Sequence, residues 1–324
     1  MSLPTDYTVH GRQAARYPFC GPWLTEWRKH AMLKKAVVMV MALFTLSVFS
    51  SPGQVQASET SQQARATWLW NPWMFVEDEA GTLAFLENKQ LNKVYVQIDR
   101  DISKAAYGSF IGQAKAMGID VYALDGAPSW VAPKGYTNQD RFMSWLTDYQ
   151  KQAAQNARFA GVHLDVEPYL YSGWKTNQAA PVKSFQSLIQ RAQASTAKLA
   201  LPLEADMPFW FDEIPYKNTY GTGLLAEWII ANSASVTIMA YRDSAPMIID
   251  IVKNEIAMAQ RLGKSIVVGV ETGVTDEGSI ITFAEEGEAF MEQELAAVAA
   301  YYAGNPAYKG NAIHHVGSWK TLKP

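Results

Sequence analysis

Three polar side chains at alternate positions, His163, Asp165 and Glu167, have the residue types and spacing of an acid–base site. In an extended strand they share one face, while Leu164 and Val166 take the other. Neighbouring carboxylates repel each other, so the pKa of one rises and a protonated group remains near neutral pH. Glycoside hydrolysis requires such a general acid, and Glu167 is the candidate. The structural alternative is that both acids only accept hydrogen bonds from loop amides.

Other acidic and aromatic residues are expected at the ends of further strands. Tyr241 and Glu271 follow two apolar runs, and we add them to Asp165 and Glu167 as candidate catalytic residues. Helix N-capping explains Asp99 or Asp125 equally well when each is taken alone, but capping does not require Tyr, Trp and paired carboxylates together. The candidate substrate-binding residues, in which Trp is the sugar-stacking platform, are Trp70, Asp99, Asp125, His163, Glu204, Asp206, Trp210, Asp243 and Trp319.

Eight short apolar runs rich in Val, Ile and Tyr are the predicted strands. They span 67–70, 93–98, 120–124, 161–166, 199–203, 235–240, 265–270 and 312–316, with helical spacing between them. Near-continuous apolar runs are typical of parallel strands that are covered on both faces. The pattern predicts an α/β chain with a single (β/α)₈ TIM barrel, whose strand ends build the active site. The alternative, an open doubly wound sheet, lacks its Gly-rich fingerprint here, which argues against a nucleotide cofactor.

The N-terminal segment resembles a secretory signal. Lys34 and Lys35 precede an apolar stretch, a Ser-Pro-Gly breaker and the small-residue site before Ser58. We therefore predict a signal peptide within 1–57, a short leader over 58–65 and the barrel over 66–324. We interpret residues 1–31 as an extension from a misplaced gene start, with Met32 as the natural start; the alternative is that they form a long n-region of the signal. The protein is thus expected to be exported, to the periplasm or outside the cell, with membrane contact only if the signal segment stays uncleaved.

Composition excludes several classes of protein. The 324 residues are 48% hydrophobic and 18% charged, which is too apolar for a disordered chain. A net charge of -3 gives no basic surface for nucleic acid. The single cysteine, Cys20, excludes a disulfide framework and a cysteine-based zinc site. We expect a glycan partner, no cofactor and no metal, and the oligomeric state stays open.

The run from Gly161 to Glu167 resembles the fourth-strand signature D-G-x-D-x-D-x-E of family 18 glycoside hydrolases, the chitinases and endo-β-N-acetylglucosaminidases. Gly161, Asp165 and Glu167 match that signature, whereas Ala160 and His163 replace its first two Asp residues. Further matches are the sixth-strand motif M-x-Y-D, here Met239 to Tyr241 with Arg242 in the Asp position, and a barrel-floor Trp after strand eight, here Trp319.

The resemblance implies a substrate-assisted mechanism. Glu167 would be the general acid and base, Asp165 would orient the N-acetyl group of the substrate, and Tyr241 would hydrogen-bond that group. The acetyl oxygen then replaces a protein nucleophile. His163 and Arg242 depart from the family pattern, because each stands where the family has a carboxylate, and these departures bear directly on N-acetyl specificity.

Three alternatives stay open. A retaining glycosidase would use Glu167 with Glu271 as nucleophile, their carboxyl groups about 5–5.5 Å apart. An inactive carbohydrate-binding barrel would keep the Trp platforms without needing Glu167. A metal-dependent hydrolase would draw its ligands from His163, Asp165, Glu204, Asp206 and His314. The glycan itself, whether chitin-like, peptidoglycan-like or another exopolysaccharide, is not predicted.

Overall fold

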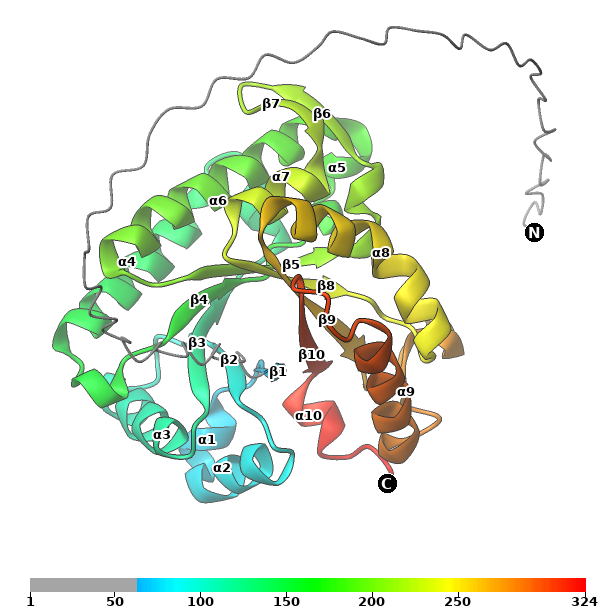
Figure 1. The fold of residues 1–324 in the computed structure, drawn as a ribbon. Coiled ribbons are helices and arrows are strands. Elements are labelled where there is room, and N and C mark those ends of the chain that lie inside the picture. Colours follow the sequence, from blue (N-terminus) through cyan, green and yellow to red (C-terminus); the bar gives the residue numbers. More distant parts are fainter. Residues whose placement is uncertain (1–62) are drawn as a thin grey trace, which may run out of the picture. The chain divides into compact units, whose positions relative to one another are not determined.

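A computed structural model of the protein describes residues 63–324. Eight parallel strands close into a barrel in the order β1-β10-β9-β8-β5-β4-β3-β2 (Figure 1). The barrel strands are β1 (Ala64–Leu69), β2 (Lys93–Gln97), β3 (Asp120–Asp125), β4 (Gly161–Leu164), β5 (Leu203–Pro208), β8 (Ser235–Met239), β9 (Ser265–Glu271) and β10 (Tyr308–His314). The predicted α/β barrel is confirmed, and the open sheet is excluded. The predicted signal peptide lies outside the described residues, and β1 begins inside the predicted leader.

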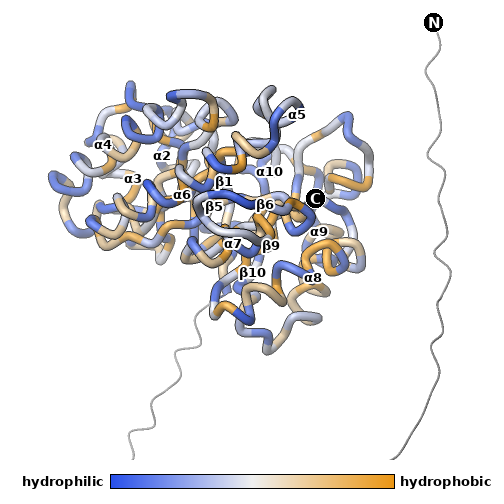
Figure 2. Tube along the Cα trace, turned by 90° about the horizontal axis from the view of Figure 1, so that it is seen from above, coloured by the Kyte–Doolittle hydropathy of each residue, from blue (hydrophilic) through white to orange (hydrophobic). Residues whose placement is uncertain are grey.

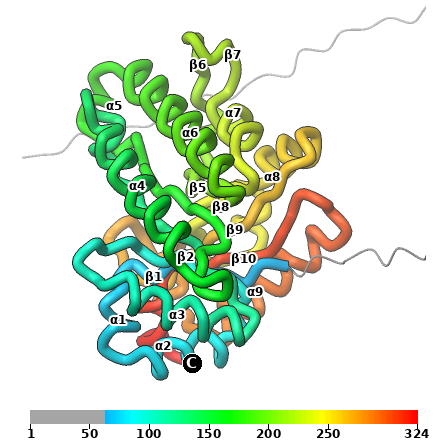
Figure 3. The backbone as a smooth tube through the Cα atoms, turned by 90° about the vertical axis from the view of Figure 1, so that its left-hand side faces the viewer, coloured from blue at the N-terminus to red at the C-terminus, as the bar shows by residue number. Residues whose placement is uncertain are grey.

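Helices follow the strands and surround the barrel (Figures 1 and 3). The α-helices are α1 (Trp73–Glu77), α2 (Glu79–Asn88), α3 (Lys104–Ala116), α4 (Tyr136–Gln152), α5 (Gly173–Thr176), α6 (Ala179–Leu199), α7 (Leu225–Asn232), α8 (Ala245–Leu262), α9 (Glu288–Tyr301) and α10 (Val316–Trp319). The 3₁₀ helices are η1 (Pro128–Val131), η2 (Gln155–Ala157), η3 (Pro168–Leu170), η4 (Phe209–Glu213) and η5 (Ser279–Ile281). An antiparallel hairpin of β6 (Pro215–Asn218) and β7 (Gly221–Leu224) lies beside α7.

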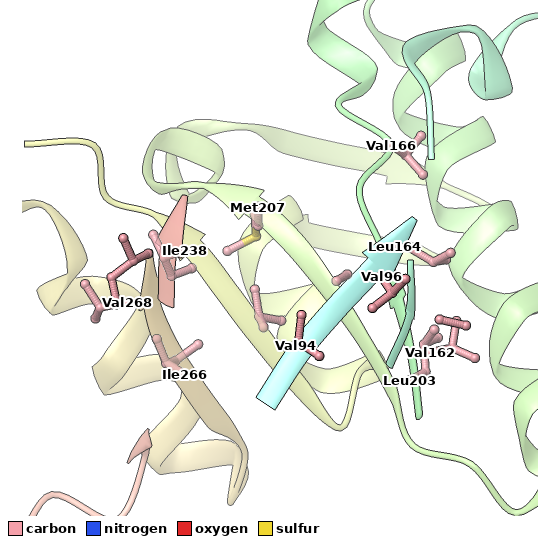
Figure 4. Close-up of a cluster of buried hydrophobic side chains, with 14 of the residues drawn as sticks. Val94, Val96, Val162, Leu164, Val166, Leu203, Met207, Ile238, Ile266 and Val268 are labelled. Atoms are coloured by element: carbon pink, nitrogen blue, oxygen red, sulfur yellow. The ribbon is translucent and has the colours of Figure 1, made fainter. Parts of the chain in front are cut away.

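The main hydrophobic core lies between the strands and the helices. Outward-facing strand residues such as Val162, Leu164 and Ile238 are at most 1% exposed and pack against the helices (Figure 4). Along the helices, hydrophilic and hydrophobic residues alternate, as amphipathic covering helices require (Figure 2). A second cluster, which includes Trp68 and Tyr95, fills the inside of the barrel. The bore is therefore packed, and a ligand can only approach at the barrel ends.

Strand β5 differs most from its prediction. The predicted strand 199–203 is the end of α6 followed by a turn, with Ala200 in the left-handed region at φ 54°. The strand itself runs Leu203–Pro208, so Glu204 and Asp206 lie within it rather than after it. At the other end of the chain, β10 stops at His314, and Val316 already begins α10.

Glu255 on α8 is an unusual core residue and allows a prediction on stability. It is 0% exposed, and its carboxylate oxygens have no hydrogen-bond partner from another described residue. Burial raises its pKa to about 8. Because this pKa lies above that of the unfolded chain, the folded state holds the proton more tightly and loses stability as the pH rises toward 8. Glu255→Gln should therefore raise the free energy of unfolding at pH 8 by about 2 kcal/mol and change it little at pH 4.

Urea unfolding at the two pH values measures this effect. Glu213→Gln, the same change at an exposed position, is the matched control. Equal changes in the free energy of unfolding at pH 4 and pH 8 would contradict the role given to Glu255 ionisation.

Candidate active site

Because all barrel strands are parallel, their C-terminal ends meet at one rim, where β4 delivers the candidate acids. The expected alternation is found: Leu164 and Val166 belong to the outer core, whereas His163 packs inside the barrel against Tyr95. Asp165 and Glu167 follow the last residue of β4 and lie on the inner side, where both interact electrostatically with Asp206.

Glu167 has the features of a functional acid. Its backbone lies in the left-handed region, at φ 49° and ψ 60°, which is unfavourable for a residue with a side chain and is concentrated at functional sites. Burial raises the pKa of Glu167, the hydrogen bond donated by the Tyr169 hydroxyl lowers it, and the charge of Asp206 raises it again, with a net upward shift. Glu167 therefore keeps its proton to a higher pH than an exposed glutamate.

Asp165 lies below Glu167 in a tightly packed position. Burial raises its pKa well above the ordinary value, and Asp206 and Glu167 raise it further. Its Oδ1 atom is buried and has no hydrogen-bond partner among residues 63–324. A Cβ atom on Gly126 would lie 1.8 Å from the Asp165 carbonyl oxygen, so only glycine lets the loop after β3 pack here.

Tyr241, which follows β8, is expected as a hydrogen-bond donor at the same site. Burial raises the pKa of its phenol well above the ordinary value, and four carboxylates raise it further. These are Glu271, Asp206, Asp165 and Glu167. The structure thus brings all four predicted catalytic residues to one rim, and the hydroxyl stays protonated and able to donate.

Glu271, at the end of β9, is held by three partners. One oxygen accepts hydrogen bonds from the amides of Thr272, at 2.8 Å, and Gly273, at 2.6 Å. The other lies 2.7 Å from His314 Nδ1. The opposite ring nitrogen of His314 accepts a 2.9 Å hydrogen bond from Trp70 Nε1. Both Glu271 oxygens are therefore already engaged within the protein, and the hydrogen bond to His314 holds Trp70 beside them.

Trp210 belongs to an aromatic group with Tyr169 and Trp174, on the side of the rim where β5 ends. Its ring centroid lies 5.1 Å from that of Tyr169 and 6.2 Å from that of Trp174. Because Tyr169 also bonds Glu167, this group lies next to the candidate acid. Trp210 and Trp174 are partly exposed, as a stacking surface for a sugar requires.

Asp99 and Asp125 do not cap helices, since Ser103 is the N-cap of α3 and Gly135 that of α4. Asp99 accepts a 2.8 Å hydrogen bond from Trp73 Nε1 and lines a pocket of about 490 Å³ that also includes Trp70. Asp125 accepts a hydrogen bond from the Gly126 amide, and burial raises its pKa to about 6. Asp243, after β8, donates its amide proton to the Ile280 carbonyl.

Three expected substrate contacts are wrong. Glu204 pairs with Lys93 and lines a pocket of about 400 Å³ with residues from the amino-terminal strand ends, because β5 begins later than predicted. His163 is 0% exposed inside the barrel and cannot reach a substrate. Trp319 is 1% exposed and packs against Phe85 of α2, because α10 carries it to the outer layer instead of the barrel floor.

Trp68 and Tyr169 are site residues that the sequence interpretation missed. Trp68 occupies the bore and donates a 3.0 Å hydrogen bond to Asp206. Trp68 precedes Trp70 by two positions, so alternation along β1 places both side chains on the same face, which was the signal for Trp68. Tyr169 follows Glu167 by two positions, which was the signal for its contact.

Two absences hold for the part of the chain that the structure describes. Within residues 63–324, no group of three or more His, Cys, Asp or Glu side chains is arranged to hold a metal ion. In the same range, none of the helices has the length and apolar character needed to cross a membrane.

No protein-family model matches the chain, and neither does any curated protein sequence. Among solved structures, a chitinase from Bacteroides thetaiotaomicron has a TM-score of 0.53 at 10% identity, with 80% of this chain and 91% of that chain covered.

Two further structures are also chitinases. One from Chromobacterium violaceum has a TM-score of 0.48 at 14% identity, covering 80% of this chain and 97% of that one. A mutant family 18 chitinase from Cycas revoluta, in complex with (GlcNAc)4, has a TM-score of 0.49 at 13% identity, covering 79% and 95%. In its barrel fold, the chain resembles the chitinase from Bacteroides thetaiotaomicron.

Proposed function

We propose that the protein is a glycoside hydrolase in which Glu167 is the general acid and base. The observation that carries the proposal is the position of Glu167 at the carboxyl-terminal rim of the barrel, in left-handed backbone, beside Asp165 and with a raised pKa. A carboxyl group kept protonated by its surroundings can donate to the glycosidic oxygen near neutral pH.

The favoured mechanism is substrate-assisted. Glu167 donates its proton to the leaving oxygen while the acetyl oxygen of the substrate attacks the anomeric carbon. Asp165 and Tyr241 hold the N-acetyl group in place for this attack. Glu167, now a carboxylate, takes a proton from water, and the hydroxide opens the cyclic intermediate. No protein nucleophile is needed, which agrees with a Glu271 whose oxygens are already engaged.

The retaining two-carboxylate mechanism is the second candidate, because Glu271, the last residue of β9, lies at the same rim and interacts electrostatically with Tyr241. It would require Glu271 to release at least one of its partners before it attacks. The two mechanisms differ in their need for an N-acetyl group, and this difference is measurable.

The test is a screen of the full chain against chitin-like, peptidoglycan-like and other polysaccharides, with the products identified. Cleavage restricted to N-acetylated glycans supports substrate assistance, and cleavage of glycans without N-acetyl groups supports the two-carboxylate mechanism. Binding without turnover supports a carbohydrate-binding barrel, and activity lost to a chelator supports a metal-dependent hydrolase. A protein that neither binds nor cleaves any of these glycans would contradict the proposal.

Tyr169→Phe should change the pH dependence of hydrolysis. The hydrogen bond from Tyr169 lowers the pKa of Glu167, so its removal raises that pKa further. Because Glu167 must be protonated to act as the acid, the alkaline limb of kcat/KM should move to higher pH. A pH profile of the variant measures the shift, with exposed Tyr301→Phe as control. A shift to lower pH would contradict the assignment of Glu167.

We also propose that the protein is exported, on the basis of the signal-like segment before Ser58. Expression of the full chain with amino-terminal sequencing of the exported product tests this proposal.

A further inference from the structure

An arginine without an acidic partner lies at the rim of the candidate active site. Arg242 follows Tyr241, shortly after the end of β8, and is half-buried. Arg65, Arg191 and Arg261 each pair with a carboxylate. Within residues 63–324, Arg242 belongs to no ion pair, and its hydrogen bond runs from Nη1 to the Tyr241 carbonyl oxygen, at 2.6 Å. No carboxylate of the described chain therefore neutralises Arg242 by direct contact.

The end of the neighbouring strand holds Arg242 in place. Pro208 of β5 pairs with Met239 of β8, so the segments that follow these two residues start side by side. The guanidinium carbon of Arg242 lies 5.1 Å from the centre of the Phe209 ring. Guanidinium groups stack favourably on aromatic rings, and the hydrogen bond to the backbone carbonyl fixes the same group at one edge. Two contacts thus restrict the side chain, while its other N–H groups have no acceptor within residues 63–324.

The position of Arg242 lies between two groups of the candidate site. On one side is Tyr241, the preceding residue, whose phenol interacts electrostatically with Glu167. On the other side is Trp210, which belongs to η4 like the ring beneath the guanidinium. The Trp210 ring lies 5.1 Å from that of Tyr169, which bonds Glu167. We therefore expect a sugar that stacks on Trp210 to have its substituents within reach of Arg242.

Arg242 differs in charge from the acids of the candidate site. Its place in the sequence is the one where the sixth-strand motif M-x-Y-D has an Asp, so the charge at this point of the rim is reversed. Arg100, which follows β2, interacts electrostatically with Asp125 on the other side of the barrel mouth. Ionised carboxylates repel an anionic substrate group, so such a group can bind only where a cation offsets them. Arg242 supplies that cation where β5 and β8 end, beside the aromatic group.

We propose that Arg242 is a specificity-determining residue that binds a carboxylate substituent of the glycan, on the sugar that stacks on Trp210. The planar guanidinium offers parallel N–H groups that match the two oxygens of a carboxylate, and such charge-assisted hydrogen bonds are stronger than neutral ones. The substrate class is therefore an acidic glycan, in which the carboxylate belongs either to a uronic acid or to an acidic ether group on an amino sugar. The inference rests on the proposed function, because it takes the same rim as the glycan site.

Calorimetric binding of three kinds of oligosaccharide to the full chain tests the proposal. Hyaluronan oligosaccharides bear the carboxylate on a uronic acid, and peptidoglycan strands freed of peptide bear it on the lactyl ether of an amino sugar. Chitin oligosaccharides contain N-acetylated sugars without a carboxylate. The wild-type protein should bind at least one acidic probe about tenfold more tightly than the chitin oligosaccharide. The two acidic probes distinguish the two sources of the carboxylate.

Arg242→Gln should lower the affinity for the acidic probe about tenfold and change the affinity for chitin oligosaccharides little. Arg242→Lys keeps the charge but not the planar fork, so it should retain only part of the preference. Arg141→Gln, the same change at an exposed arginine of α4, is the matched control and should leave all affinities unchanged. If Arg242→Gln does not fold, the methyl ester of the acidic probe tests the same contact on the wild-type protein and should bind about tenfold more weakly than the free acid.

Three results would overturn the role of Arg242: no preference of the wild-type protein for either acidic probe, an affinity that esterification leaves unchanged, or equal losses of Arg242→Gln on acidic and neutral probes. The last result would indicate a structural role for the arginine. The two proposals also fail separately. An acidic glycan that binds through Arg242 but is not cleaved would refute the hydrolase and retain the carboxylate site. Cleavage of chitin oligosaccharides with no preference for acidic glycans would retain the hydrolase and refute the carboxylate site.

Discussion

Glu167→Gln is expected to lower the kcat of glycan hydrolysis by about 10³-fold, within the range that a general acid contributes. Glutamine keeps the shape of the side chain and can accept the hydrogen bond from Tyr169, but it cannot donate an acidic proton to the leaving oxygen. Loss of an ionisable group whose burial raises its pKa should not destabilise the fold. Melting temperature and glycan binding should therefore stay near the wild-type values.

Initial rates, calorimetric binding and thermal unfolding on the same preparation separate these effects. Glu213→Gln, the same change at an exposed site of η4, serves as the control and should keep full activity. A Glu167→Gln protein with wild-type turnover would refute the assignment, and one that has lost both binding and its melting transition would indicate a structural role.

Tyr241→Phe has the second largest expected effect, a loss of about 10²-fold in kcat on N-acetylated glycans. The change removes one oxygen atom from a partly buried ring whose hydroxyl stays protonated because its pKa is raised by burial and by neighbouring carboxylates. In the substrate-assisted mechanism this hydroxyl stabilises the acetyl group as it attacks, so the loss should fall on kcat more than on KM.

Tyr301→Phe, at a ring that is 66% exposed, is the matched control and should change neither constant. If the protein also cleaves glycans that lack N-acetyl groups, Tyr241→Phe should affect those substrates far less. Equal losses on both kinds of substrate would contradict the acetyl-holding role and favour the two-carboxylate mechanism.

The barrel was predictable because its strands are buried on both faces and read as apolar runs. Alternation along β4 predicted that His163, Asp165 and Glu167 lie on the inner side, but His163 is buried in the bore and only the two acids lie toward the rim. Strand β5 was misplaced for the opposite reason. Glu204 and Asp206 point into a polar part of the bore, so β5 does not read as apolar, whereas the apolar end of α6 does match the pattern of a buried strand.

The surroundings of the site residues depend on contacts between distant segments. Trp319 lies five residues after the last strand residue, yet the short helix α10 turns it to the outer layer. The engagement of Glu271 by His314 joins β9 and β10, and the contact between Asp206 and Trp68 crosses the bore from β5 to β1. Spacing within one strand contains no information on such contacts.

The most direct test of the central role of Glu167 compares the wild-type protein with Glu167→Gln on two aryl glycosides of the glycan that the protein cleaves. One leaving group has a low pKa and departs without a proton, and the other has a high pKa and needs one. General acid catalysis predicts that the variant loses about 10³-fold in kcat/KM on the second glycoside and little on the first. Equal losses on both glycosides would contradict Glu167 as the general acid.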